Sequence, residues 1–200
     1  MKIFSRVVAV ILVLLMALPA FAQEVPLSEL SRYLNGLRTA EAPFTQINAD
    51  GSRAEGTVYI RRPGRMRFEY NAPVRNLVMA GGGQVAIFDA KSNSGPQQYP
   101  LSKTPLNLIL APTVDLGQAR MVVGHGTQGS DTYVIAQDPK NPQYGQIRLV
   151  FSSNPIALKQ WIITDEAGTQ TTTQLGPLKL GENYPPSFFN IPLETAKRQR

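Results

Sequence analysis

His125, the one histidine of the chain, lies in the glycine-flanked segment GHGTQG and is the first residue to consider for chemistry. A histidine that acts as a general base needs a nucleophile and an orienting acid, and a metal-binding histidine needs further ligands. The residues that flank His125 do not supply such a set. We therefore expect an exposed loop histidine rather than a catalytic one.

The other reactive side chains also lack the surroundings of an active site. Ser102 and Ser153 are not in a G-x-S-x-G context, and no Lys-Ser/Thr follows the glycine triplet 81–83 as it would in a phosphate-binding loop. The carboxylates stand in turn-like segments, where such side chains bend and cap the chain: Asp115, Asp131, Asp138, Asp165 and Glu166. The sequence therefore predicts a protein that is not an enzyme and holds no metal or cofactor.

Arg62 has the most informative position of any charged residue. Side chains alternate along a strand, so a strand over 56–62 places Val58, Ile60 and Arg62 on one face. Pro63-Gly64 ends this strand, because proline has no N–H to donate and glycine accepts turn geometry. Either Arg62 reaches water at the strand end, or it donates its N–H groups to carbonyls of an element that covers the apolar face.

The strand after Pro63-Gly64 continues the same apolar face. Met66, Phe68 and Tyr70 point to one side of it, and Arg65, Arg67 and Glu69 point to the other. Arg62 then points into a largely apolar space.

The first 22 residues have the features of a signal peptide. Lys2 and Arg6 give a charged start, an apolar run spans 7–18, and Ala20-Phe21-Ala22 is an A-x-A cleavage site. The run is too short for a comfortable membrane span, and no cysteine follows that could carry a lipid anchor. We expect an exported, soluble protein that begins near Gln23.

The composition limits the remaining classes. Residues 23–200 are expected to form a single domain, and without cysteine this domain must be held together by its hydrophobic core. The signal peptide contains two of the positive charges, so the formal net charge falls from +6 to +4. A basic exported protein could approach anionic headgroups or an acidic partner. No nucleic-acid-binding motif is present, and nucleic acid is not an expected partner.

Two helices are predicted among many short strands. Leucines recur at helical spacing over 26–38, and 103–110 has Thr104 as a cap, Pro105 in the first turn and an apolar side. The polar segment 92–100 is expected to be mobile. Besides a strand that starts at Pro43 and the pair around Pro63, strands are predicted at 76–80, 85–89, 121–123, 132–136, 146–151, 159–165 and 169–175.

This pattern predicts a mainly β (α+β) fold. Consecutive strands joined by hairpins favour an antiparallel meander with one apolar and one wet face, and only two or three short helices are available to cover the apolar face. A strongly curved sheet around those helices, an open barrel with a lid, satisfies both conditions. Such a face without catalytic residues is typical of a carrier for a hydrophobic ligand.

Several motifs along the chain resemble one family, the periplasmic outer-membrane lipoprotein carrier proteins, the soluble carriers of the Lol pathway (LolA family). The matching segments follow a leucine-rich helix: APFTQ (42–46), GTVYIRRP (56–63), RFEY (67–70) with Pro73, KTPL (103–106), DEAG (165–168) and FFNIP (188–192). Each motif alone is weak, but the combination behind a signal peptide is fairly specific.

The resemblance implies a fold, a location and a cargo. It implies a periplasmic monomer whose unclosed antiparallel half-barrel is covered by helices that act as a lid. An inner-membrane ABC transporter would hand over a lipoprotein, its acyl chains would enter a cavity, and an outer-membrane receptor would take them. The family's lid arginine, which bonds lid backbone in the closed form, corresponds to Arg62.

We expect the cavity to be lined by the apolar face of the sheet. The proposed cavity residues are Val58, Ile60, Met66, Phe68, Leu77, Met79, Ile147, Leu149, Phe151 and Trp161. The proposed lid residues are Leu106, Ile109 and Leu110.

The sequence departs from the best-known members at two places. Met66 replaces an aromatic residue that is linked to docking with the transporter, and the chain ends soon after Ile191-Pro192, where those members continue with a further strand.

Three other functions remain as alternatives. A half-barrel can serve as a periplasmic lipid sensor, although this normally requires a second domain. The protein could carry a different lipid, such as a glycolipid. A lipid-modifying enzyme that uses His125 is the third alternative.

Overall fold

The computed structural model describes residues 24–92, 94–118 and 120–198. The predicted signal peptide lies outside these residues. Within them no helix is both long enough and apolar enough to cross a membrane.

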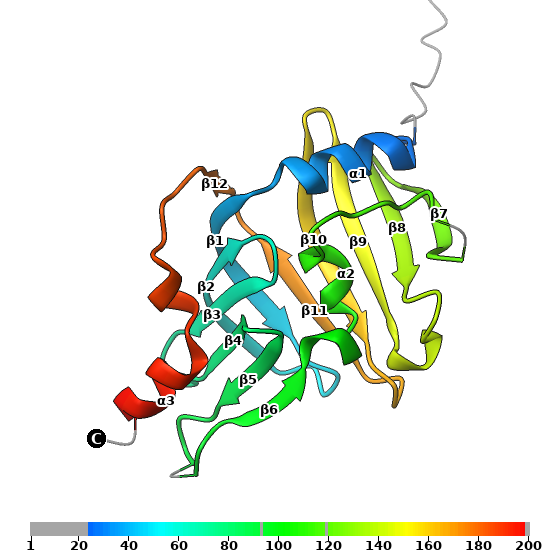
Figure 1. Ribbon diagram of the computed structural model, residues 1–200. Helices are drawn as coiled ribbons and strands as arrows, with labels where there is room; N and C mark the ends of the chain where they lie inside the picture. Colours follow the sequence, from blue (N-terminus) through cyan, green and yellow to red (C-terminus); the bar gives the residue numbers. More distant parts are fainter. Residues whose placement is uncertain (1–23, 93, 119, 199–200) are drawn as a thin grey trace, which may run out of the picture.

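One antiparallel sheet forms the body of the molecule (Figure 1). Its strands are β1 (Thr39–Ile47), β2 (Arg53–Arg61), β3 (Arg65–Tyr70), β4 (Leu77–Gly81), β5 (Gln84–Phe88), β6 (Gln97–Pro100), β7 (Val122–Gln128), β8 (Asp131–Gln137), β9 (Gln146–Ser153), β10 (Ile156–Thr164), β11 (Gln170–Leu175) and β12 (Lys179–Leu180). The order β6-β5-β4-β3-β2-β1-β11-β10-β9-β8-β7 leaves the sheet unclosed, and β12 pairs with β1. This is the predicted open, mainly antiparallel architecture.

In the part of the chain that the structure describes, three short α-helices accompany the sheet: α1 (Leu27–Gly36), α2 (Leu106–Leu110) and α3 (Ile191–Arg198). In Figure 1, α1 crosses the end of strands β8–β10 and α2 lies between the two halves of the sheet. The 3₁₀ turns are η1 (Leu101–Lys103), η2 (Pro142–Tyr144) and η3 (Pro186–Phe189). Both predicted helices are present, but the second begins at Leu106 rather than at Lys103, and Thr104 donates to the carbonyl of Leu101 instead of capping it. The helix α3 was not predicted.

The main hydrophobic core lies between the inner face of the sheet and the two helices α1 and α2. Leu30 and Leu34 on α1 are fully buried there, which explains the leucine spacing of this helix. They pack with residues from both halves of the sheet, including Val58 and Phe151. An apolar stripe on such a short helix gains most of its stability from this packing rather than from helix propensity.

A second, smaller core lies on the opposite face of the sheet, beneath α3. Ile191 packs there with Leu77, Met79, Ala86 and Phe88. The C-terminal helix therefore covers a sheet face that the sequence alone did not show to be apolar.

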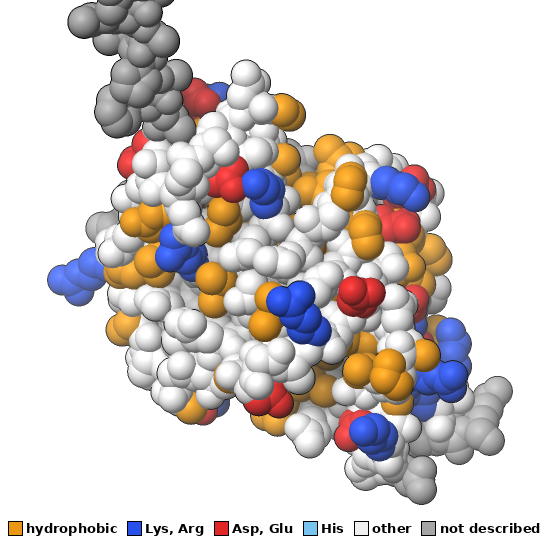
Figure 2. All heavy atoms as spheres, turned by 180° about the vertical axis from the view of Figure 1, so that it is seen from behind, with side chains coloured by type: hydrophobic (Ala, Val, Ile, Leu, Met, Phe, Trp, Pro, Cys, Tyr) orange, Lys and Arg blue, Asp and Glu red, His pale blue; other side chains and the backbone are white. Residues whose placement is uncertain are grey.

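The surface on the side opposite to the view of Figure 1 carries scattered basic and acidic side chains between small apolar areas (Figure 2).

Two other segments differ from the prediction. Residues 97–100, expected to be mobile, form β6 and pair with β5. The first strand begins at Thr39 rather than at Pro43, and its first residues pair with the last residues of β2. Residues 97–100 are polar, so they carry no alternating pattern that would mark a strand. Residues 39–42 do alternate, with Ala40 and Ala42 buried, but only small side chains mark the inner face there.

Candidate functional site

The alternation around Pro63 holds in the structure. Val58 pairs with Phe68 and Ile60 with Met66, and all four side chains are buried in the main core. Two cross-strand pairs thus present one apolar surface toward α1 and α2.

The prediction that Leu77 and Met79 line the same face is wrong. β3 and β4 pair with Glu69 opposite Leu77 and with Arg67 opposite Met79, so both apolar side chains share the outer face with charged residues. They belong to the core under α3. The segment Leu77–Gly81 is apolar on both faces, and only the register with β3 decides which residues point inward. Val78 takes the inward position.

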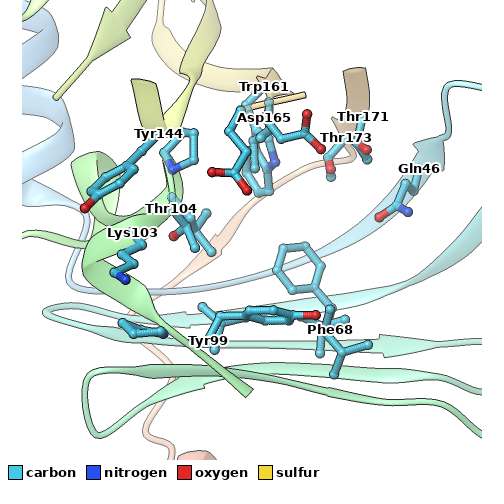
Figure 3. Close-up of a pocket in the computed structure, with 18 of the residues that line it drawn as sticks. Gln46, Phe68, Tyr99, Lys103, Thr104, Tyr144, Trp161, Asp165, Thr171 and Thr173 are labelled. Atoms are coloured by element: carbon cyan, nitrogen blue, oxygen red, sulfur yellow. The ribbon is translucent and has the colours of Figure 1, made fainter. Parts of the chain in front are cut away.

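A cavity of about 620 Å³ opens between the two halves of the sheet, within the range of ~300–1,000 Å³ that is usual for small-molecule sites. Its walls come from β3–β6 on one side and from β10 and β11 on the other, with the segment 103–106 along the edge (Figure 3). The lining residues are Gln46, Phe68, Tyr70, Val78, Val85, Ile87, Tyr99, Pro100, Lys103, Thr104, Pro105, Leu106, Tyr144, Trp161, Ile163, Asp165, Glu166, Thr171 and Thr173.

Only part of the predicted set lines this cavity. Phe68, Trp161 and Leu106 do. The other predicted inward-facing residues are packed in the main core beneath the helices: Val58, Ile60, Met66, Ile147, Leu149, Phe151, Ile109 and Leu110. The cavity wall and the packed core lie on the same face of the sheet, so the alternation of side chains alone cannot distinguish them.

Arg62 lies immediately after β2 and is only 8% exposed. One terminal nitrogen donates to the carbonyl oxygen of Leu34 in α1, and the other donates to that of Ala111, 2.7 Å away, at the end of α2. A longer contact of 3.5 Å reaches Oδ1 of Asn35. The guanidinium therefore bonds to both covering helices and does not extend to water.

The backbone around Arg62 fastens the same elements. The N–H of Arg62 donates to the carbonyl of Arg38, and that of Gly64 donates to the carbonyl of Leu110, each over 2.8 Å. Burial, with a further contribution from the charge of Arg38, lowers the pKa of Arg62. An arginine nevertheless stays protonated in proteins, so the bonds to the helices are charge-assisted.

Two residues of α1 that the sequence did not single out hold the segment after α2. The Asn35 amide donates to the carbonyl of Val114 over 2.8 Å and accepts from its N–H over 2.9 Å. The Ser31 hydroxyl accepts from the N–H of Leu116 over 3.0 Å. The helix α1 and the segment 111–116 are thus joined independently of Arg62. Asn35 is 79 residues from its partner, so no local signal could have revealed the contact.

His125 lies in strand β7 and is half-buried, so the expectation of an exposed loop histidine is wrong. Its Nδ1 is 2.7 Å from the carboxylate of Glu24, and its Nε2 is 3.0 Å from the carbonyl of Val25. These contacts hold the start of the described chain against the sheet. Between residues 24 and 198, no described group of three or more acidic or histidine side chains is arranged to hold a metal ion.

On the outer face, Arg67 connects the sheet to the C-terminal segment. It contacts Glu69 at 2.6 Å and Glu194 at 3.3 Å, donates to the carbonyl of Phe188 over 3.2 Å, and lies over the Phe188 ring. Burial favours the neutral form of Glu194, but hydrogen bonds from Arg198 and Arg67 prevail and hold its pKa below the usual range.

Comparison with known proteins identifies the family. Residues 35–192 match the model of the family described as "Outer membrane lipoprotein carrier protein LolA". An outer-membrane lipoprotein carrier protein of Coxiella burnetii is 28% identical over 179 residues, which cover 85% of this chain and 84% of the relative. One of Methylococcus capsulatus is 26% identical over 178 residues and covers 85% of each chain.

Among solved structures, a LolA superfamily protein of Nitrosomonas europaea aligns with a TM-score of 0.42 at 12% identity, over 83% of this chain and 98% of that chain. The sequence resemblance noted above and the family match agree over most of the described residues. The chain therefore belongs to the outer membrane lipoprotein carrier protein family, LolA, a family of carriers and not of enzymes.

Proposed function

We propose that this protein is a periplasmic carrier that receives lipoproteins from an inner-membrane ABC transporter and delivers them to an outer-membrane receptor. Residues 1–22 direct export and are removed, and residues 23–200 form a single carrier domain that acts as a monomer. The acyl chains of the cargo occupy the space between the two halves of the sheet. The family membership supports the carrier role.

The observation that carries this proposal is the buried Arg62 beneath the covering helices. Its guanidinium donates to backbone carbonyls of α1 and of the end of α2, so both helices are held over the inner face of the sheet. We propose that Arg62 is a latch that closes the lid while the carrier is empty. Leu106, Ile109 and Leu110 are the lid side chains that move when cargo enters.

The energetics of acyl transfer explain why a latch is useful. Burying an acyl chain yields about 0.8 kcal/mol per CH₂ group, so one long chain represents on the order of 10 kcal/mol. Water cannot hold such a chain, and the periplasm supplies no nucleotide to drive its release. A lid that closes through charge-assisted hydrogen bonds opposes part of the binding free energy. The next acceptor can then take the cargo.

A release assay tests this function. Purified protein without residues 1–22 is added to spheroplasts that are synthesising an outer-membrane lipoprotein. We expect the lipoprotein to appear in the medium in a one-to-one complex with the carrier. A lipoprotein that stays in the membrane at every carrier concentration would contradict the proposal.

A further inference from the structure

One row of side chains crosses the cavity at a single level of the sheet. In the strand register, Gln46 of β1 is opposite Thr173 of β11, and Thr173 is opposite Trp161 of β10. All three line the cavity, on the side that faces Phe68 and Tyr99 (Figure 3). Three of the hydrogen-bonding side chains of the cavity thus stand in line across neighbouring strands, next to apolar lining residues such as Phe68 and Val85.

The three members of this row differ in what they bond. The Gln46 amide accepts from the Tyr70 hydroxyl over 2.6 Å and donates to Oδ1 of Asn48 over 2.7 Å. Trp161 is 1% exposed and Thr173 is 3% exposed. Among residues 24–198 as described, neither the indole N–H nor the threonine hydroxyl has a hydrogen-bond partner.

These two polar groups are nevertheless not sealed in the packed core. In the described part of the chain, the side-chain nitrogens and oxygens that are sealed from solvent without a partner are Nε of Arg62 and Nε of Arg148. The polar atoms of Trp161 and Thr173 are not among these, so each keeps some exposed surface, and both residues line the cavity. Two neighbouring donors, each on a buried side chain, are therefore available to a ligand in the cavity.

We propose that Trp161 and Thr173 form a donor pair that binds the carbonyl oxygen of an acyl linkage in the cargo. This inference rests on the proposed carrier function and names the chemical group that the cavity recognises. A plain hydrocarbon that filled the cavity would leave both donors without partners in an apolar medium, which is unfavourable. An ester or amide bond brings an acceptor, and the indole N–H can only donate.

This pair would also fix how deeply the cargo enters. A few placed polar groups in an apolar pocket orient a ligand, while the apolar surface supplies most of the affinity. With the acyl linkage held at Trp161 and Thr173, the hydrocarbon beyond it contacts apolar lining residues such as Phe68, Val85 and Leu106.

Strand propensity alone offers a simpler explanation of the threonine, because β-branched residues are favoured in strands. Valine would serve that purpose equally well at position 173. The substitution Thr173→Val keeps the shape and removes the hydroxyl, so it separates the two explanations. Thr172→Val is the matched control, because Thr172 points to the other face of the same strand.

The experiment compares four synthetic lipopeptides of the same peptide sequence. One has two ester-linked palmitoyl chains and one has two ether-linked hexadecyl chains. The other two add a third chain to the ether compound: an amide-linked palmitoyl chain in one, and a hexadecyl chain without a carbonyl group in the hydrocarbon-only control. Binding is followed by tryptophan fluorescence, since Trp161 is the only tryptophan in the chain. We expect the wild-type carrier to bind the ester compound about three- to tenfold more tightly than the ether compound, or to regain that affinity with the amide chain.

Thr173→Val should reduce this preference, and Thr172→Val should leave it unchanged. Two results together would overturn the donor pair: the wild-type carrier binds the ester and ether compounds equally, and the amide-linked chain adds no more affinity than the added hydrocarbon chain of the hydrocarbon-only control. The carrier function would remain intact. Failure to bind any of the compounds counts against the carrier function itself. If Thr173→Val does not fold, the affinities of the wild-type protein for the same compounds still test the donor pair.

Discussion

Replacing Arg62 with leucine is expected to tighten acyl-chain binding and to slow release. The guanidinium donates to carbonyls of two elements, at Leu34 and at Ala111. At about 1.5–3 kcal/mol for a hydrogen bond from a charged group, two bonds favour the closed lid by about 3–6 kcal/mol. The cost of burying the charge offsets about half of this, so the bonds favour the closed lid by about 1.5–3 kcal/mol. Their loss should raise the affinity for an acyl chain roughly ten- to 150-fold.

The assay uses a fluorescent lipopeptide with palmitoyl chains. The dissociation constant is measured by anisotropy, and the release rate by transfer to acceptor liposomes. The Arg62→Leu protein should show a dissociation constant lower by about one to two orders of magnitude, and a release rate lower by a similar factor.

The neighbouring arginine provides the control. Arg61 points to the outer face and donates to the carbonyl of Tyr184 over 2.5 Å, away from both lid helices. Arg61→Leu should bind and release the lipopeptide as the wild type does. If all three proteins bind and release it equally, Arg62 is not a latch, whatever its contribution to stability.

Two further predictions concern the outer face of the sheet. Because its pKa is lowered in the folded state, ionised Glu194 stabilises the fold above the ordinary pKa of 4.5, and this stabilisation disappears as the pH falls through the folded-state pKa. Thermal melts should therefore show Glu194→Gln less stable than the wild type at pH 7, with a gap that narrows below about pH 4.5; a constant gap would refute this. Leu77→Ala should lower the free energy of unfolding by about 2–5 kcal/mol without changing lipopeptide affinity, whereas Val78→Ala should weaken binding. Equal effects of the two on affinity in the same assay would show that the assignment of their faces is wrong.

Alternation was sufficient to predict the segment around Arg62. Period-two patterning assigned Val58, Ile60 and Arg62 to one face, and this arrangement followed from the residues alone. The covering helices were also predictable, because the leucine spacing of 26–38 fits only a helix packed on a broad apolar surface. The partners of Arg62 were not, since they lie 28 and 49 residues away.

Alternation failed where both faces of a strand are apolar. Leu77, Val78 and Met79 all suit a core, and only the pairing with Arg67 and Glu69 assigns them. It also could not tell a cavity wall from a packed interior. Phe151 lies in the main core, where its ring packs edge-to-face with that of Tyr33 on α1, while Ile163 on the neighbouring strand β10 lines the cavity. The distinction depends on how far the helices reach over the sheet, which is a property of the whole fold.

The C-terminal helix shows a different limit. Its one buried residue, Ile191, gives no helical repeat, and Arg67 on the distant strand β3 contacts Glu194 of the helix. A segment of that kind has too few apolar residues for periodicity to detect. Its position over β4 and β5 follows from the second core, which the sequence alone does not reveal.

The most direct measurement is mass spectrometry of what the protein holds when it is purified from the periplasm under native conditions. The carrier account predicts acylated lipoproteins in complex with the wild-type protein, and a larger occupied fraction in Arg62→Leu, because the lid no longer closes against the cargo. A protein that is recovered empty in both forms, or that holds only a lipid without an attached polypeptide, would contradict it.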